Sequence, residues 1–298
     1  MPVSTAHAGV AGHPIGHSLS PRLHEAAYRV LGEAIDYRAY DLEEGELTGQ
    51  IALLRQDPAW QGMSVTMPLK SEAAELADEL SDQAAAVGTV NTLRPRSDGS
   101  LLGHNSDVAG IAASLRAAGA VPEGARASVL GGGGTATAAL AALQQLGAEE
   151  IELWVRSPQR AGRAVEAAER LGLPLRIRDW DAAAEHLAGS DLVVSTLPPH
   201  GADDLAAQLA SVPGRSTGGT LLDAAYDPWP SALARAWQRA GGTVVPGLDM
   251  LVLQALDQIR LFTGRSIDQT LPQEHAVIRA LCTAAGRPEL AEAVLRSS

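Results

Sequence analysis

The chain has 298 residues, of which 46% are apolar and 19% are charged, and its formal net charge is −12. This length favours two domains, and the composition is that of an ordinary globular protein. The negative charge argues against partners such as nucleic acid or an anionic membrane, because both require a basic surface. No apolar run reaches the ~18–20 residues of a membrane span. With one cysteine, Cys282, and no leader-like N-terminus, we expect a cytoplasmic protein without an internal disulfide.

Lysine is almost absent from this sequence. Of the 23 basic residues, 22 are arginine, and Lys70 is the one lysine. A coding bias against lysine would explain the excess of arginine, and a single lysine could survive such a bias by chance. A functional reason is favoured, because the pKa of a lysine ammonium can shift until it exchanges protons, whereas a guanidinium stays charged. Lys70 is therefore a candidate catalytic residue.

Residues 1–110 alternate short apolar runs with helical patterns, which predicts an α/β domain. In the first predicted helix, Ser20 is expected to be the N-cap, Pro21 the first helical residue and Gly32 the end. The predicted strands are Ala8–Gly12, Ile35–Tyr40, Gln61–Val65 and Val87–Leu93, and the predicted helices are Pro21–Leu31 and Ser71–Leu80.

A second domain is predicted over residues 111–245, after a linker signal at Pro122–Gly124. Strand Ala127–Leu130 leads through four glycines into the alanine-rich helix Thr135–Leu146. The alternation of strands and helices continues and predicts a parallel sheet; its further strands are Ile151–Val155, Leu192–Ser195 and Thr220–Ala224. Residues 246–298 are predicted to be helical and to pack on the first domain.

The glycine run is typical of a dinucleotide-binding loop. Gly131, Gly133 and Ala136 fit the pattern G-x-G-x-x-[GA], in which small residues allow a tight turn and close approach to a pyrophosphate. Backbone N–H groups at the start of the following helix would bind the phosphates. A flexible linker can also be rich in glycine, but the strand before and the helix after this run favour cofactor binding. The predicted loop residues are Gly131, Gly132, Gly133, Gly134 and Thr135.

The end of the next strand favours NADP over NAD. An NAD site commonly places an acidic residue there for the ribose 2′-hydroxyl, but Glu152 comes too early in the strand. Arg156 stands at the strand end and can pair with a 2′-phosphate, with Ser157 and Arg160 beside it. Alternatively, Ser157 is a plain helix N-cap and both arginines are solvated.

Five segments resemble the shikimate dehydrogenase family, in the family's order and along nearly the whole chain. They are residues 12–21 (GHPIGHSLSP), 62–70 (GMSVTMPLK), 88–92 (GTVNT), 103–107 (GHNSD) and 247–254 (GLDMLVLQ). The resemblance implies an N-terminal α/β substrate domain, a Rossmann-type NADP-binding domain and C-terminal helices that return to the first domain. It also implies reversible NADPH-dependent reduction of 3-dehydroshikimate to shikimate, a step of chorismate and aromatic amino-acid biosynthesis.

The resemblance also assigns roles to individual residues. Lys70 and Asp107 would be catalytic: a lysine ammonium can give a proton to the oxygen that forms when a ketone accepts hydride, and a carboxylate can hold the amine and the reacting hydroxyl. Without the resemblance, each of the substrate-binding candidates is an ordinary turn or strand polar group. By resemblance, Ser18, Ser20 and Tyr226 would bind the substrate carboxylate, Thr66, Asn91, Asp107 and Gln254 its ring hydroxyls, and Gly247 would belong to the cofactor site.

The sequence departs from the family pattern in two places. Ser64 stands where the family commonly has asparagine, which removes an amide from the lysine motif. Val155 and Ser157 flank Arg156 where the family commonly reads Asn-Arg-Thr, which keeps the charge and the hydroxyl but loses an amide. The second change would weaken NADP binding without reversing the preference for it.

Two alternative functions stay open. A quinate/shikimate dehydrogenase shares the fold and the lysine and often uses NAD; Arg156 argues against NAD. The second alternative is a non-catalytic NADP-binding paralogue. The presence of both Lys70 and Asp107 argues against it, because a protein that only binds NADP does not need a pair of residues for proton transfer. His13, His17 and His24 lack carboxylate or cysteine partners at ligand spacing, so no metal site is predicted. The expected partner is a small-molecule substrate, and the expected state is a monomer or homodimer.

Overall fold

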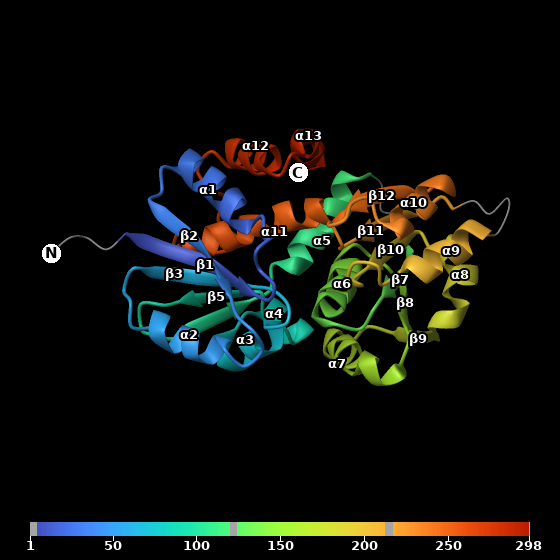
Figure 1. Cartoon of the computed structure of the whole chain (residues 1–298), viewed down its shortest axis with the longest axis horizontal. Helices are drawn as coiled ribbons and strands as arrows, with labels where there is room; N and C mark the ends of the chain where they lie inside the picture. The colour runs from blue at the N-terminus through green and yellow to red at the C-terminus, as the bar shows by residue number, and fades with distance from the viewer. Residues whose placement is uncertain (1–4, 120–123, 212–216, 298) are drawn as a thin grey trace. The chain divides into compact units, whose positions relative to one another are not determined.

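A computed structural model describes residues 5–119, 124–211 and 217–297. The chain divides into two compact units, each with its own six-stranded sheet (Figure 1). Unit 1 comprises residues 1–106 and 252–295, and unit 2 comprises residues 107–251 and 296–298. The boundaries predicted from the sequence, after residues 110 and 245, lie four and six residues from the observed ones. Across the described residues, no helix is long and apolar enough to cross a membrane.

Unit 1 has a mixed sheet with the order β2-β1-β3-β5-β6-β4. Strands β2, β1 and β3 run parallel, β5 is antiparallel to both β3 and β6, and β4 is parallel to β6. Its strands are β1 (Ala6–Gly12), β2 (Ile35–Asp41), β3 (Trp60–Val65), β4 (Glu79–Leu80), β5 (Thr92–Pro95) and β6 (Leu101–His104). Its helices are α1 (Ser20–Leu31), α2 (Leu47–Leu54), α3 (Lys70–Leu76), α4 (Asp82–Val87) and α12 (Glu274–Ala284), together with most of α11 (Gly247–Phe262) and α13 (Pro288–Ser297).

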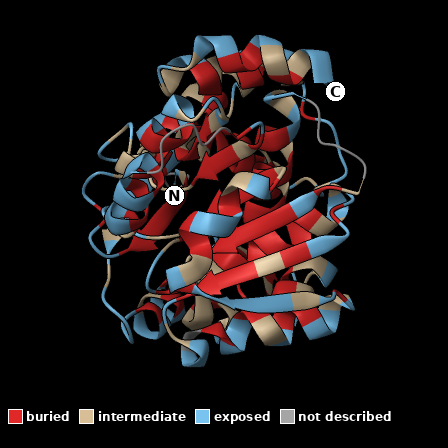
Figure 2. Ribbon diagram, turned by 90° about the vertical axis from the view of Figure 1, so that its right-hand side faces the viewer, coloured by how far each residue is buried: buried red, intermediate tan, exposed pale blue. Residues whose placement is uncertain are grey.

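Apolar side chains fix how the helices of unit 1 pack. Helices α2 and α3 contribute Leu47, Ile51 and Ala73 to a cluster that also contains Met63 of β3 and Leu93 of β5. The last three helices, α11, α12 and α13, belong largely to this unit, and α12 packs against α1. In the chain as a whole, most strand residues in Figure 2 are buried, whereas the outward faces of many helices are exposed. Burial of these apolar faces is the main source of stability for such helices.

Unit 2 has an all-parallel sheet with the order β12-β11-β10-β7-β8-β9. Counted by position in the chain, this is the 3-2-1-4-5-6 order of a Rossmann fold, read from the other edge. Its strands are β7 (Arg126–Leu130), β8 (Glu150–Val155), β9 (Leu175–Asp179), β10 (Leu192–Ser195), β11 (Thr220–Asp223) and β12 (Thr243–Pro246). Its helices are α5 (Asp107–Ala117), α6 (Gly134–Gln145), α7 (Gly162–Leu171), α8 (Ala183–His186), α9 (Asp203–Ser211) and α10 (Ala232–Arg239), with short 3-10 turns η1 (Pro158–Ala161), η2 (Trp180–Ala182) and η3 (Leu187–Gly189).

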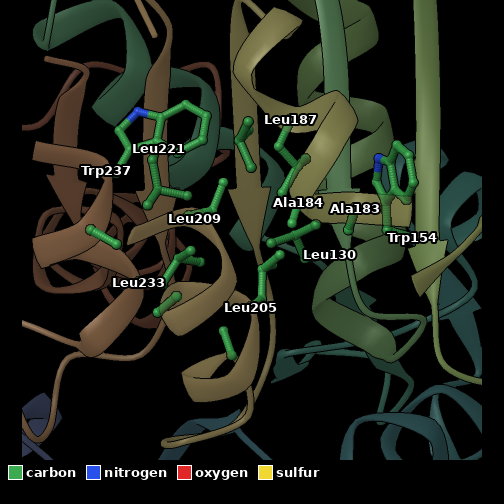
Figure 3. Packing of buried hydrophobic residues seen from close by; sticks show 14 of the residues in the cluster. Leu130, Trp154, Ala183, Ala184, Leu187, Leu205, Leu209, Leu221, Leu233 and Trp237 are labelled. Carbon is green, nitrogen blue, oxygen red and sulfur yellow. The ribbon is translucent and has the colours of Figure 1, made fainter. Parts of the chain in front are cut away.

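The parallel sheet is covered by two groups of neighbouring helices, α5–α6–α7 and α8–α9–α10. Figure 3 shows Leu205, Leu233 and Trp237 from the second group packed against Leu130 and Leu221 of the strands. Strands covered on both faces are largely apolar, which explains why β7, β8, β10 and β11 were predicted from the sequence; β12 and the mostly exposed β9 were not predicted. The predicted α/β class with a Rossmann-type domain is confirmed.

Two predicted elements of unit 1 were wrong. The helix predicted over Ser71–Leu80 ends at Leu76, because the backbone N–H of Asp78 donates to Leu101 O (2.9 Å) and the chain joins the sheet as β4. The strand predicted over Val87–Leu93 is instead the end of α4, followed by β5. The hydroxyl of Ser81 caps α4 and Gly88 ends it in a left-handed conformation, and both signals were present in the sequence. The linker signal at Pro122–Gly124 begins outside the described residues.

Candidate active site

One edge of the unit 1 sheet collects the ends of four strands. Strands β1 and β3 are parallel neighbours, so both finish there, and Thr66 N donates to Ala11 O (2.9 Å). Strand β5 runs the opposite way and begins at the same edge, with Thr92 opposite Ser64. Strand β6 ends there in turn, since His104 pairs with Thr92. Segments that lie far apart in the sequence are therefore brought to one edge of the sheet.

The loop between β1 and α1 carries Ser18 and Ser20. Ser20 was predicted to cap α1, and this is wrong: it is the first residue of the helix, Leu19 holds the cap position, and no side chain caps from there. The Ser18 hydroxyl instead accepts from Ser20 N at 3.3 Å. Ser20 is buried and Ser18 is half-buried. The predicted end of the helix is confirmed, because Gly32 adopts the left-handed conformation there (φ 70°).

Lys70 is the first residue of α3, four residues after Thr66. Its carbonyl accepts from Val90 N at 3.2 Å, so the start of α3 is attached to the segment that carries Asn91. Both Lys70 and Thr66 are half-buried. The geometry places the one lysine of the chain at the same sheet edge as Thr66 and Asn91.

Three buried polar side chains form a hydrogen-bonded cluster at this edge. Asn91 Nδ2 donates to Ser106 Oγ (3.0 Å) and to Gln254 Oε1 (3.3 Å), and Ser106 Oγ donates to Gln254 Oε1 (2.8 Å). Gln254 comes from α11, about 160 residues downstream of Asn91, as counted along the sequence. Two of the predicted substrate residues are thus in direct contact, and Ser106, which was not predicted, joins them.

Asp107 follows Ser106 directly and begins α5. Its side chain is buried, with 5% of the residue exposed. Asp107 is the first residue of unit 2, whereas Lys70 lies in unit 1. Burial of a carboxylate is costly unless polar or charged groups lie close to it, which makes Asp107 a candidate functional residue.

The glycine loop of unit 2 lies where the strand order reverses, between β7 and β10. Gly131 has φ 105°, a conformation that favours glycine, and a Cβ there would lie 2.8 Å from Thr196 Oγ1. Its N–H donates to Trp154 O at 3.0 Å. Gly133 precedes α6 and has open space around it, and Gly134 is the first helical residue. Gly132 and Thr135 complete this loop, which is the position where parallel α/β sheets bind ligands.

Arg156 is exposed at the C-terminal end of β8, the strand beside β7. Its guanidinium lies over the Trp180 ring, 5.0 Å from the centroid, and donates to Gly201 O. The hydroxyl of Ser157 bonds to Gln159 rather than capping the turn η1 that follows. Arg160 lies in η1, and its side chain is outside the described part of the structure.

Two further predicted residues lie near the ends of β11 and β12. Tyr226 follows β11 and is half-buried, and burial raises the pKa of its phenol. Gly247 begins α11, where a Cβ would lie 2.3 Å from Ala224 O. This close approach to the backbone after β11 is sufficient reason for a glycine at position 247.

The sequence reasoning did not single out Ser106 or Gln258. Gln258 is buried and lies one helical turn after Gln254 on α11, so the i, i+4 spacing of two glutamines was the available signal. Within the described ranges, no three His, Cys, Asp or Glu side chains come together in a way that could hold a metal.

Comparisons with known proteins show which family the chain resembles. Residues 10–93 match the family model of the shikimate dehydrogenase substrate binding domain. A protein of Rubrobacter xylanophilus named shikimate dehydrogenase (NADP(+)) is 36% identical over 263 residues, which cover 87% of this chain and 91% of the relative.

Solved structures are similar over nearly the whole chain. The shikimate dehydrogenase of Mycobacterium tuberculosis is 39% identical with a TM-score of 0.79, covering 92% of this chain and 99% of that one. The Thermus thermophilus enzyme, solved in complex with NADP(H) and shikimate, is 32% identical with a TM-score of 0.74, covering 94% and 99%. The resemblance predicted from the five sequence segments is confirmed, and the chain belongs to the shikimate dehydrogenase family.

Proposed function

We propose that this protein is an NADP-dependent shikimate dehydrogenase, which reversibly reduces 3-dehydroshikimate to shikimate in aromatic amino-acid biosynthesis. The observation that carries the proposal is the sheet edge of unit 1, where Thr66, Lys70 and Asn91 come together. Family membership over most of the chain supports the same reaction.

The substrate is a small ring that bears one carboxylate and several hydroxyls. Ser18 and Ser20 would bind the carboxylate through their hydroxyls, and Tyr226 would reach the same group. Neutral polar side chains suit the ring hydroxyls, because each can donate or accept. Thr66, Asn91 and Gln254 are the neutral side chains that would bind the ring hydroxyls. The carboxylate of Asp107 would bind a ring hydroxyl as well.

Lys70 and Asp107 would carry the proton chemistry. In the reducing direction, the Lys70 ammonium stabilises the negative charge that develops on the ring oxygen and gives it a proton. In the oxidising direction, the neutral amine accepts the proton of the alcohol. Asp107 would orient the amine and bind the reacting hydroxyl.

Unit 2 fits a dinucleotide. NADP, when bound, supplies or accepts the hydride. The backbone N–H groups of the loop Gly131–Thr135 would bind the pyrophosphate, and the open space around Gly133 allows its close approach. Arg156, Ser157 and Arg160 would bind the 2′-phosphate, and Arg156 has further N–H donors besides the one that contacts Gly201 O. Gly247 would lie at the edge of the cofactor site.

The test measures absorbance at the nicotinamide band for the purified protein with shikimate or quinate and with NADP or NAD. We expect the highest kcat/KM for shikimate with NADP. A higher value for quinate with NAD would favour a quinate/shikimate dehydrogenase instead. No reaction with any pair, together with measurable NADP binding, would favour a non-catalytic NADP-binding paralogue.

A cytoplasmic location and a monomeric or homodimeric state complete the proposal. The small-molecule substrate is the partner that the family assigns, and the net charge of −12 supports the absence of nucleic-acid and membrane partners. Gel filtration with light scattering would measure the oligomeric state.

A further inference from the structure

A chain of buried hydrogen bonds runs behind the candidate substrate residues of unit 1. Gln258 of α11, Ser64 of β3 and Thr92 of β5 are 2%, 3% and 0% exposed, and none belongs to the substrate-binding set proposed above. Buried polar side chains are costly unless their hydrogen bonds are satisfied, so a connected chain of them has a strongly preferred arrangement.

The direction of these bonds follows from groups that can only donate or only accept. Gln258 Nε2 faces the carbonyl of Asn91 (3.3 Å), which can only accept, and also donates to Thr92 Oγ1 (3.2 Å). Gln258 Oε1 therefore faces Ser64, whose hydroxyl donates to it at 2.8 Å. Ser64 accepts in turn from the hydroxyl of Tyr37 at 2.6 Å. The amide of Gln258 has one orientation that satisfies all these partners.

The same reasoning fixes Asn91. The backbone N–H of Ser106 can only donate, and it lies 2.9 Å from Asn91 Oδ1, which identifies the oxygen of that amide. Thr92 Oγ1 donates to the same oxygen at 2.9 Å. Because Thr92 accepts its own bond from Gln258, its proton is directed at Asn91. The donors thus run in one direction, from Tyr37 through Ser64, Gln258 and Thr92 to Asn91.

His24 supports this orientation from the other side of Gln258. Burial lowers the pKa of His24 to about 3, so the imidazole is neutral and one nitrogen carries a proton. His24 Nε2 lies 3.4 Å from Gln258 Oε1, and Nδ1 lies 3.0 Å from the hydroxyl of Tyr28. With the proton on Nε2, both contacts are satisfied. The ring also stacks on Tyr37 at 3.9 Å, which holds both side chains in place.

We infer that Gln258 is a positioning residue, which through Thr92 and the Asn91 carbonyl fixes the Asn91 amide so that its NH₂ group faces Ser106 and Gln254 of the candidate site. The inference rests on the proposed function, in which Asn91 binds a ring hydroxyl. If the Asn91 amide were reversed, its oxygen would face Gln254 Oε1, which is also an acceptor. Its NH₂ group would then face the backbone N–H of Ser106, which is also a donor. Ser64, which stands where the family commonly has asparagine, supplies the donor that holds Gln258.

The test is a double-mutant cycle on the full-length protein with Gln258→Met and Asn91→Ala. Gln258→Met keeps the volume of the side chain and removes its hydrogen bonds. We expect it to lower kcat/KM for shikimate about tenfold, the scale of one lost hydrogen bond, mainly through KM. The KM for NADP should not change. In the Asn91→Ala background the same substitution should have no further effect on kcat/KM, because the side-chain amide that Gln258 orients is already absent.

Two controls separate positioning from a general loss of stability. Gln144→Met removes a comparable bond to a backbone carbonyl, Leu171 O (3.0 Å), in unit 2, and should leave the KM for shikimate unchanged. Thr92→Ser keeps the relaying hydroxyl and Thr92→Val removes it, so the serine variant should retain the wild-type KM and the valine variant should not. This pair also tests the inference if Gln258→Met fails to fold.

The outcomes are distinct. If the wild type oxidises shikimate and the two substitutions at Gln258 and Asn91 act independently, the positioning role is overturned and the proposed function stands. If Thr92→Ser and Thr92→Val have equal effects on the KM for shikimate, the positioning role is again overturned. If the wild type does not act on shikimate at all, the proposed function falls and the inference falls with it.

Discussion

The two units place their candidate sites at strand ends in different ways. In unit 2 the glycine loop presents backbone groups next to one strand, and residues 131–136 contain nearly all of it. In unit 1 the site is made of side chains from α1, α3, α11 and the loops beside β1, β3, β5 and β6, and long-range hydrogen bonds join three of them, Asn91, Ser106 and Gln254. A site made from backbone can be encoded in one short segment, whereas a site made from side chains requires the whole sheet to be in register.

The comparison predicts that the largest loss of rate comes from unit 1. Lys70→Ala should lower kcat by at least about 10²-fold, the usual scale for a general acid–base group. Lys70→Arg should also be strongly impaired, because a guanidinium does not release its proton. Steady-state kinetics would measure this, with NADP affinity and Tm as controls that should stay near wild type. A Lys70→Ala protein with normal kcat would contradict the catalytic role.

In unit 2 the largest expected effect is on cofactor choice. Arg156→Ala removes a charge-assisted interaction of roughly 1.5–3 kcal/mol, which is about a ten- to hundredfold loss of NADP affinity. NAD lacks the 2′-phosphate, so its binding should hardly change, and Ser157→Ala should act in the same direction more weakly. The measurement is kcat/KM for both cofactors at saturating shikimate.

A matched control is Arg178→Ala on β9, which loses only an exposed ion pair with Glu152. If Arg156→Ala weakens NADP and NAD equally, Arg156 instead holds the loop through Gly201, and the preference for NADP would depend on Arg160.

Two substitutions in the glycine loop test whether the cofactor site of unit 2 is made from backbone groups. Gly131→Ala introduces a Cβ at φ 105° and beside Thr196, so it should cost roughly 1–2 kcal/mol of stability and lower NADP affinity about tenfold. Gly133→Ala has open space and a negative φ, so Tm should stay the same while NADP affinity still falls. Thermal unfolding and cofactor titration would measure both. Equal losses of Tm would show that strain at Gly131 is not the cause.

The smallest expected effect is a pH dependence confined to unit 1. The pKa of His24 is lowered from 6.5 to about 3, so the unfolded chain binds a proton that the folded chain does not. The stability that results from this difference is fully present above pH 6.5 and is lost as the pH falls toward 3. When the pH is lowered from 8 to 6, the free energy of unfolding of the wild type should fall by about 1 kcal/mol more than that of His24→Phe.

Hydrogen exchange at the two pH values would locate this effect. Amides of β1 and β3 in unit 1 should lose protection, while those of β7 and β10 in unit 2 should change equally in wild type and His24→Phe. Equal pH dependence of unit 1 in both proteins would contradict the assignment to His24.

The strands that were predicted in unit 2 have more accurate bounds than those predicted in unit 1, although β9 and β12 of unit 2 were not predicted. Parallel strands buried on both faces are short apolar runs, and the glycine loop follows one of them, so local patterns were sufficient. Helix α6 was predicted within one residue at each end. In unit 1, β4 and β5 depend on pairing with β6, and this pairing overrides the helical preference of residues 77–80.

The sequence by itself determined the family, the glycine loop and the candidates Lys70 and Asn91, because motifs and a unique residue type are visible without a fold. Only the tertiary structure decided that Gln258 and Ser106 belong with them, and that Leu19 rather than Ser20 holds the cap position of α1. The reason is that a hydrogen bond depends on the distance and direction between two groups. When those groups are more than a hundred residues apart, as Asn91 and Gln254 are, only the folded chain sets both.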